Sequence, residues 1–224
     1  MGETIGELLP LAIGVAISPV PIIAVILMLF APRATGTSLG FLLGWIAGII
    51  AATALFVWLA GITDLGSGTG PSAAVSWIKL ALGALLLLLA LRRWRARPAP
   101  GTEAALPTWM AAIDEFTPAK ALGLGFALSA INPKNLAMCA AAGVTIGGAA
   151  LPGGQQVTTA AIFTILAACT VAVPVIAYAL ASSAMRAPLD RLKAWLQGNN
   201  ATVMATLLLV LGVVLVGKGL GGLL

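Results

Sequence analysis

The sequence predicts an all-α integral membrane protein with six transmembrane helices, and three observations support this fold class. Hydrophobic residues make up 60% of the chain and charged residues only 8%, whereas soluble domains carry roughly 25% charged residues. Apolar stretches near the length of about 20 residues that a spanning helix needs cover 5–31, 37–61, 72–91, 120–147, 157–182 and 201–220. These stretches are long and continuous, unlike the short alternating strands of a transmembrane barrel.

The first apolar stretch is expected to be a permanent helix. Glu3 and Glu7 stand where a cleavable signal peptide carries basic residues, and the apolar run is too long for such a peptide. The six stretches use most of the chain, and only about 92–119 and 183–200 are polar over any length. We therefore expect no soluble catalytic domain, no catalytic residues and no enzyme activity.

The basic residues predict the orientation in the membrane. Lys79 and Lys218 fall near one side of the predicted bundle, and Lys134 falls inside a span. The other side receives Arg33, Arg92, Arg93, Arg95, Arg97, Lys120, Arg186, Arg191 and Lys193. Because loops rich in Lys and Arg stay in the cytoplasm, we expect a multi-pass plasma membrane protein with both termini outside. The same bias explains the net charge of +5 without a nucleic acid as partner.

An internal repeat relates the two halves of the chain. The segment Gly14–Pro21 aligns with Gly125–Pro133 when one extra residue is allowed, and Gly, Ala, Ser and Pro then coincide. Leu80–Gly83 likewise aligns with Leu209–Gly212. Because each half holds an odd number of spans, the second half enters the membrane from the opposite side. The sequence thus predicts two inverted three-helix repeats, an architecture common among secondary transporters.

These features divide the chain into three parts. The first repeat covers 1–97, a cytoplasmic loop covers 98–119, and the second repeat covers 120–224. Within the loop, apolar side chains recur near helical period between two prolines. They are Trp109, Met110, Ile113 and Phe116. This pattern predicts a short helix in the membrane interface. The polar stretch 183–200 repeats the pattern after Pro188, with Leu189, Leu192, Trp195 and Leu196, and predicts a second such helix that ends at Gly198-Asn199-Asn200.

Prolines near the middle of the first and fourth spans predict two broken helices. Proline removes a backbone hydrogen bond and clashes with the preceding turn, so Pro19, Pro21 and Pro133 should open their helices there. The freed backbone groups need partners or must line a wet cavity or bind a substrate. Nearby polar side chains can supply some of these partners: Ser18, Ser129, Asn132 and Asn135.

Lys134 is the only charged side chain expected near the middle of a span. It lies about 15 residues, or roughly 22 Å, from the cytoplasmic start of its helix. A charge at this depth is costly unless it faces a cavity or a partner, and it marks a functional site by default. The half-helix that begins after Pro133 points its positive end to the same place. Together with Asn132 and Asn135, Lys134 predicts a site for an anionic group such as phosphate or carboxylate.

Other chemistries lack the residues that they need. The chain has no His and no carboxylate deep in a span, so we expect neither a proton relay of the usual kind nor a metal site or other cofactor. Cys139 and Cys169 are interpreted as small apolar fillers. Glycines recur every four residues at 40, 44 and 48, a spacing that lets two helices approach closely. We expect this contact to lie within one copy of the chain.

Several motifs carry a resemblance to a known family. They are the run from Pro107 to Asp114 continuing through Ala121–Gly125, the segment Ser129–Asn135 with Ala142–Gly143, and Trp195–Thr202. Over essentially its whole length the chain resembles the GAP family, the glycopeptidolipid-addressing or sulfolipid-addressing membrane proteins of mycobacteria and related actinobacteria. That family is grouped with the lysine-exporter superfamily, which has six spans and an Asn-Pro pair in the fourth.

The resemblance implies an exporter that acts on lipids of the cell envelope. The leading hypothesis is export or flipping of an anionic or glycosylated lipid, or its precursor, across the plasma membrane. Surrounding membrane lipids, a larger lipid-export complex and a homo-oligomer remain compatible partners. One alternative is an exporter of small amino acids, and another is a non-transporting scaffold subunit of a lipid-export machine. A thiol-disulfide relay of the same superfamily needs a cysteine in each broken helix, and the first span has none.

Overall fold

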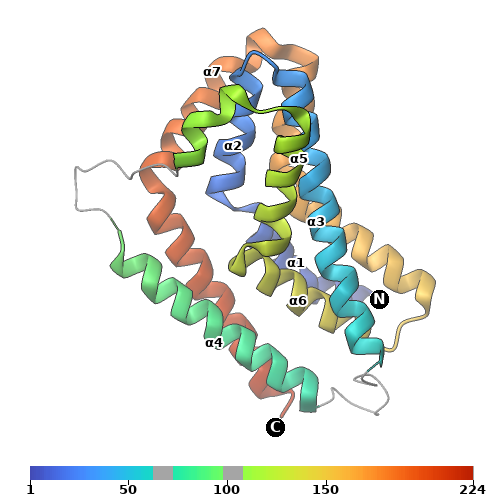
Figure 1. Ribbon diagram of the computed structural model, residues 1–224. Coiled ribbons are helices and arrows are strands. Elements are labelled where there is room, and N and C mark those ends of the chain that lie inside the picture. Colours follow the sequence, from blue (N-terminus) through green and yellow to red (C-terminus); the bar gives the residue numbers. More distant parts are fainter. Residues whose placement is uncertain (63–72, 98–107, 224) are drawn as a thin grey trace.

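The computed structural model describes residues 1–62, 73–97 and 108–223, and all regular structure in these residues is helical (Figure 1). The elements in order are α1 (Gly2–Ala16), α2 (Pro19–Phe30), α3 (Ala34–Ile62), α4 (Ala73–Arg95), the 3₁₀ helix η1 (Thr108–Glu115), α5 (Pro118–Phe126), the π-helical segment η2 (Ala127–Ile131), α6 (Pro133–Gly147) and α7 (Gly153–Gly221). The all-α class predicted from composition is confirmed.

Several helices have the length and apolar character to cross a membrane. Among the described residues, α3, α4 and α7 qualify individually. The helices α1 and α2 qualify only when they are taken together, and the bend of 53° between them fits a broken span or a re-entrant loop. The segment Pro118–Ile131, formed by α5 and η2, is a shorter apolar helix, and α6 follows it. The chain is therefore a membrane protein.

The long helix α7 contains two of the predicted apolar stretches. Its 69 residues would extend about 100 Å if straight, several times the thickness of a bilayer. Ala181 departs from helical geometry, with φ −149° and ψ 58°, and Figure 1 shows α7 turning back at one end of the molecule to form two arms. Residues 183–200 continue the helix after this kink, so the short helix predicted after Pro188 is part of α7 and does not end at Gly198-Asn199-Asn200.

The glycines of α3 provide the tightest helix contact. A Cβ atom added at Gly40 would fall against the Pro118 carbonyl oxygen, and one at Gly44 against the Leu122 carbonyl oxygen. At Gly48 the added atom would meet the hydroxyl of Ser129. The helix partner is α5 with η2, so the predicted packing within one chain is confirmed.

The connection between the two halves is only partly described. Residues 98–107 lie outside the described part of the chain. The predicted short helix is present as η1, and its Met110 and Ile113 are buried in the hydrophobic core. This face of η1 therefore packs on protein. The interfacial position of its other face remains a prediction.

Candidate functional site

Two interrupted helices position the candidate site. The helix α1 ends at Ala16, and α2 begins at Pro19 with Ser18 in an extended conformation before it. In the second half, Asn132 is extended and α6 begins at Pro133. Proline suits the first helical position because the N–H that it lacks would have no partner there. Pro21 lies in the first turn of α2 and does not interrupt it.

Lys134 joins the two interruptions. Its side chain comes from the first turn of α6 and is 3% exposed. The ammonium Nζ donates a hydrogen bond of 2.6 Å to the carbonyl oxygen of Gly14 and one of 2.5 Å to the hydroxyl of Ser18. A cation is favourable at a helix carboxyl end, where the helix dipole is negative. Lys134 therefore stabilises the broken end of α1.

Polar side chains form further hydrogen bonds at the two helix interruptions. Ser18 donates to Asn135 Oδ1 over 3.2 Å, and Asn135 Nδ2 donates to the Leu128 carbonyl oxygen over 2.8 Å. Thr170 of α7 donates to the Ala16 carbonyl oxygen over 2.6 Å. In a lipid environment each unpaired backbone group is costly, so these bonds stabilise the two breaks. Asn132 caps α6 by accepting from the Lys134 backbone N–H over 3.1 Å.

A small cavity of about 30 Å³ opens at this crossing. It is lined by Ser18, Val20, Pro21, Arg93, Asn132, Lys134, Asn200 and Met204. Its volume holds about two water molecules. The cavity is thus bordered by both interruptions, by the last turns of α4 and by α7.

Arg93 and Asn200 line the cavity, although the sequence did not indicate them as site residues. Arg93 was attributed to the positive side of the membrane, and Asn200 to the connection before the last span. Asn200 Oδ1 is buried and has no hydrogen-bond partner within the described part of the chain. Both residues are distant from Lys134 in sequence, and no local pattern indicates that α4 and α7 bring them to the broken helices.

Of the predicted site residues, Ser18, Pro21, Asn132 and Lys134 line the cavity, whereas Pro19, Ser129, Pro133 and Asn135 do not. The Ser129 hydroxyl donates to the carbonyl oxygens of Gly125 and Phe126, each over 3.0 Å, and its side chain packs against Gly48. It is absent from the cavity lining, and so is Asn135, whose amide is bonded to Ser18 and Leu128. Ser129 and Asn135 therefore contribute hydrogen bonds and packing around the site and do not line the cavity.

The charges around the cavity are of one sign. Arg93 and Lys134 are its ionisable lining residues, and no carboxylate is among them. Within the residues that the structure describes, no ion pair involves Lys134. Lys79 differs, because its ammonium lies 3.2 Å from Glu7 Oε2. Lys79, which the sequence places near one side of the predicted bundle, is thus paired with a carboxylate of α1.

The fold and the site define a class, a helical membrane protein with a buried cationic centre between broken helices. The sequence profile of the sulfolipid-1-addressing protein (Sap) family matches residues 8–221. The chain belongs to this family, as its resemblance to the sulfolipid-addressing proteins predicted. No curated protein and no solved structure gives a significant match. The chain is therefore a membrane protein of a family whose description concerns the addressing of a lipid.

Proposed function

We propose that the protein exports or flips an anionic or glycosylated lipid of the cell envelope, or its precursor, from the inner to the outer leaflet of the plasma membrane. The family supports a role in lipid addressing. The plasma membrane location, the outward termini and the absence of enzyme activity are parts of the same proposal. Membership of the lysine-exporter superfamily would agree with it.

The observation that carries this proposal is a small cavity lined by two cations, the buried Lys134 and the exposed Arg93. Lys134 has three N–H donors, and the described residues supply two acceptors, Gly14 and Ser18. One donor is thus available to a ligand. Arg93 adds a second cation, and the unpartnered Asn200 Oδ1 can accept from a hydroxyl group. These groups suit a headgroup that combines negative charge with hydroxyls.

We further propose that the chain forms six spans as two inverted repeats. The broken pairs α1–α2 and α5–α6 would be the leading helices of the repeats, and the two arms of α7 would be spans five and six. The aligned glycines of the third and sixth spans support this arrangement. A Cβ at Gly83 would lie 3.0 Å from the Gly212 carbonyl oxygen, and a Cβ at Gly212 would lie 3.1 Å from the Gly83 carbonyl oxygen. Reciprocal contact between equivalent residues is the signature of a two-fold relation.

This architecture suggests how access could alternate. Ligand pockets usually measure about 300–1,000 Å³, so the cavity of about 30 Å³ is too small for a lipid headgroup in this conformation. Rocking of one repeat against the other around the broken helices would admit the headgroup from one leaflet and release it to the other. The bonds from Lys134 to α1 connect the two repeats and would have to rearrange in this step.

The proposal is tested in cells and with purified protein. A deletion strain should accumulate the lipid inside and lose it from the surface, and a complemented strain should restore the surface lipid. Purified protein in liposomes should then accelerate movement of an anionic lipid between leaflets. Normal surface lipid in the deletion strain would refute the proposal. A cellular defect without flux in liposomes would favour a scaffold, and flux of a free amino acid alone would favour an amino-acid exporter.

A further inference from the structure

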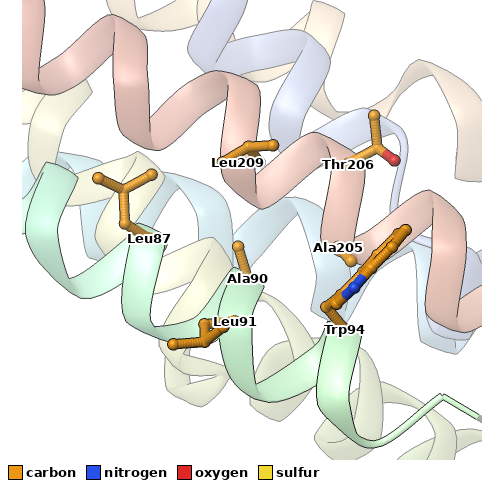
Figure 2. A pocket seen from close by; sticks show the side chains of 7 residues that line it. All are labelled: Leu87, Ala90, Leu91, Trp94, Ala205, Thr206 and Leu209. Atoms are coloured by element: carbon orange, nitrogen blue, oxygen red, sulfur yellow. The ribbon is translucent and has the colours of Figure 1, made fainter.

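A second, apolar cavity lies between α4 and the last arm of α7 (Figure 2). Its volume is about 340 Å³, within the usual range for small-molecule sites. It is lined by Leu87, Ala90, Leu91, Trp94, Ala205, Thr206 and Leu209. Figure 2 shows Ala90 facing α7 in the middle, with Trp94 at one end and Leu87 at the other. The lining is mainly apolar, and the cavity is open to the surface of the helix pair, where Leu91, Trp94, Thr206 and Leu209 are exposed.

The shape of this cavity follows from the side chains on the two helices. At Gly83 and Gly212 the backbones of α4 and α7 are in close contact, and Leu87 packs directly over Gly212. Beyond Leu87 the facing residues are the small and buried Ala90 and Ala205. They leave the space between the helices unfilled. The cavity is therefore closed at the glycine contact and continues toward the carboxyl end of α4.

At Trp94 and Ala205 the lining of the apolar cavity comes within one residue, along each helix, of the lining of the cationic cavity. Trp94 and Ala205 line the apolar cavity, and their sequence neighbours Arg93 and Met204 line the cationic one. Arg97 stacks over the Trp94 ring at 4.0 Å. Tryptophan and arginine at a helix end are typical of the boundary between headgroups and hydrocarbon. The cationic cavity would thus suit the headgroup of a lipid, and the apolar cavity would suit one of its acyl chains.

We propose that the cavity between α4 and α7 binds one acyl chain of an anionic lipid whose headgroup is held by Arg93 and Lys134. This inference rests on the proposed function and specifies its substrate as a molecule with both a negative headgroup and a hydrocarbon tail. The charges favour an anionic over a zwitterionic headgroup. The apolar lining favours a flexible alkyl chain, because the gain comes from burial of methylene groups.

Photo-crosslinking of a lipid tail tests this proposal. The probe is phosphatidylglycerol with a diazirine in one acyl chain, reconstituted with the purified full-length protein, and the labelled peptides are located by mass spectrometry. We expect labelling to concentrate on 87–94 of α4 and 205–209 of α7. Phosphatidylcholine with the same tail should label these segments less. Equal labelling of every lipid-facing helix by both probes would overturn the proposal.

A pair of substitutions on one helix separates the cavity from the general lipid-facing surface. Ala90→Phe fills the cavity and should reduce this labelling about tenfold, since the excluded tail loses its buried methylenes. Ala84→Phe adds the same side chain at an exposed position of α4 and should leave labelling unchanged. Ala205→Phe repeats the test from α7 if Ala90→Phe does not fold.

The outcomes separate this inference from the proposed function. Unchanged tail labelling in folded Ala90→Phe and Ala205→Phe would overturn the inference, whatever export shows. Charge-selective labelling of α4 and α7 in a protein that moves no lipid would support the inference and contradict the proposed function. Loss of both labelling and export in the cavity variants, with both retained in Ala84→Phe, would support the two together.

Discussion

Replacement of Lys134 by Met tests whether the buried cation binds the headgroup. The substitution keeps the apolar stem and removes the hydrogen bonds to Gly14 and Ser18. It also removes a buried charge, whose desolvation is unfavourable. The two effects on folding oppose each other, so we expect the variant to reach the membrane. For headgroup binding the two effects do not oppose each other, because the substitution only removes an attraction to the negative charge.

The expected loss of binding can be estimated from the geometry. A hydrogen bond between charged partners contributes about 1.5–3 kcal/mol, and a loss of about 2 kcal/mol weakens binding roughly thirtyfold. We therefore expect Lys134→Met to reduce export of the native lipid by at least about tenfold at matched protein levels in the membrane. Lys134→Arg should retain part of the export, because the charge remains while the shape and donor geometry change.

A matched variant separates headgroup binding from support of α1. Ser18→Ala removes one acceptor of Lys134 and keeps the charge, so it reports how much the network itself contributes. Thermal midpoints of the purified variants in detergent show whether folding has changed. Wild-type export by a normally abundant Lys134→Met protein would refute the reasoning, and Lys134 would then serve only to hold α1.

Three further predictions concern packing and orientation. Gly44→Ala should destabilise the purified protein by about 1–3 kcal/mol, because the new methyl group meets the backbone of α5. Gly61→Ala has open space around it and should not destabilise the protein. Equal thermal midpoints of the two variants would contradict the packing argument. Glu7→Gln should lower the midpoint only slightly, since partly exposed ion pairs contribute little; a large loss would reveal a stronger role. In a Cys-free background, an impermeant thiol reagent added to intact cells should label Gln155→Cys and not Asp190→Cys; the reverse would invert the topology.

Most of the fold could be predicted from local sequence patterns. Apolar length located the helices, and proline chemistry placed the interruptions at Ser18 and Asn132, where the structure has them. The spacing of the α3 glycines predicted their close contact. The helix predicted after Pro188 is present, but its continuation through Gly198-Asn199-Asn200 into the last span was missed, because glycine and asparagine favour a helix end and do not by themselves impose one.

The site could be predicted only in part. Lys134 was evident because a charge inside an apolar stretch is rare, and Asn132 because it precedes a proline. That Lys134 bonds the end of α1, and that Arg93 and Asn200 reach the same cavity, depends on how distant helices cross. One sequence carries no local signal for such crossings. Ser129 was included on the basis of proximity in sequence, and its actual contact with α3 follows from helix rotation.

The comparison of two lysines explains why the anion site is assigned to one of them. Both Lys79 and Lys134 lie within apolar helices, and both side chains are largely withdrawn from the surface. Lys79 has the Glu7 carboxylate as a counter-ion within the protein and shares it with Lys218. Lys134 has only neutral acceptors among the described residues, a carbonyl and a hydroxyl. A buried cation without a counter-ion gains most from an external anion, so Lys134 is where a lipid's negative headgroup would bind most strongly.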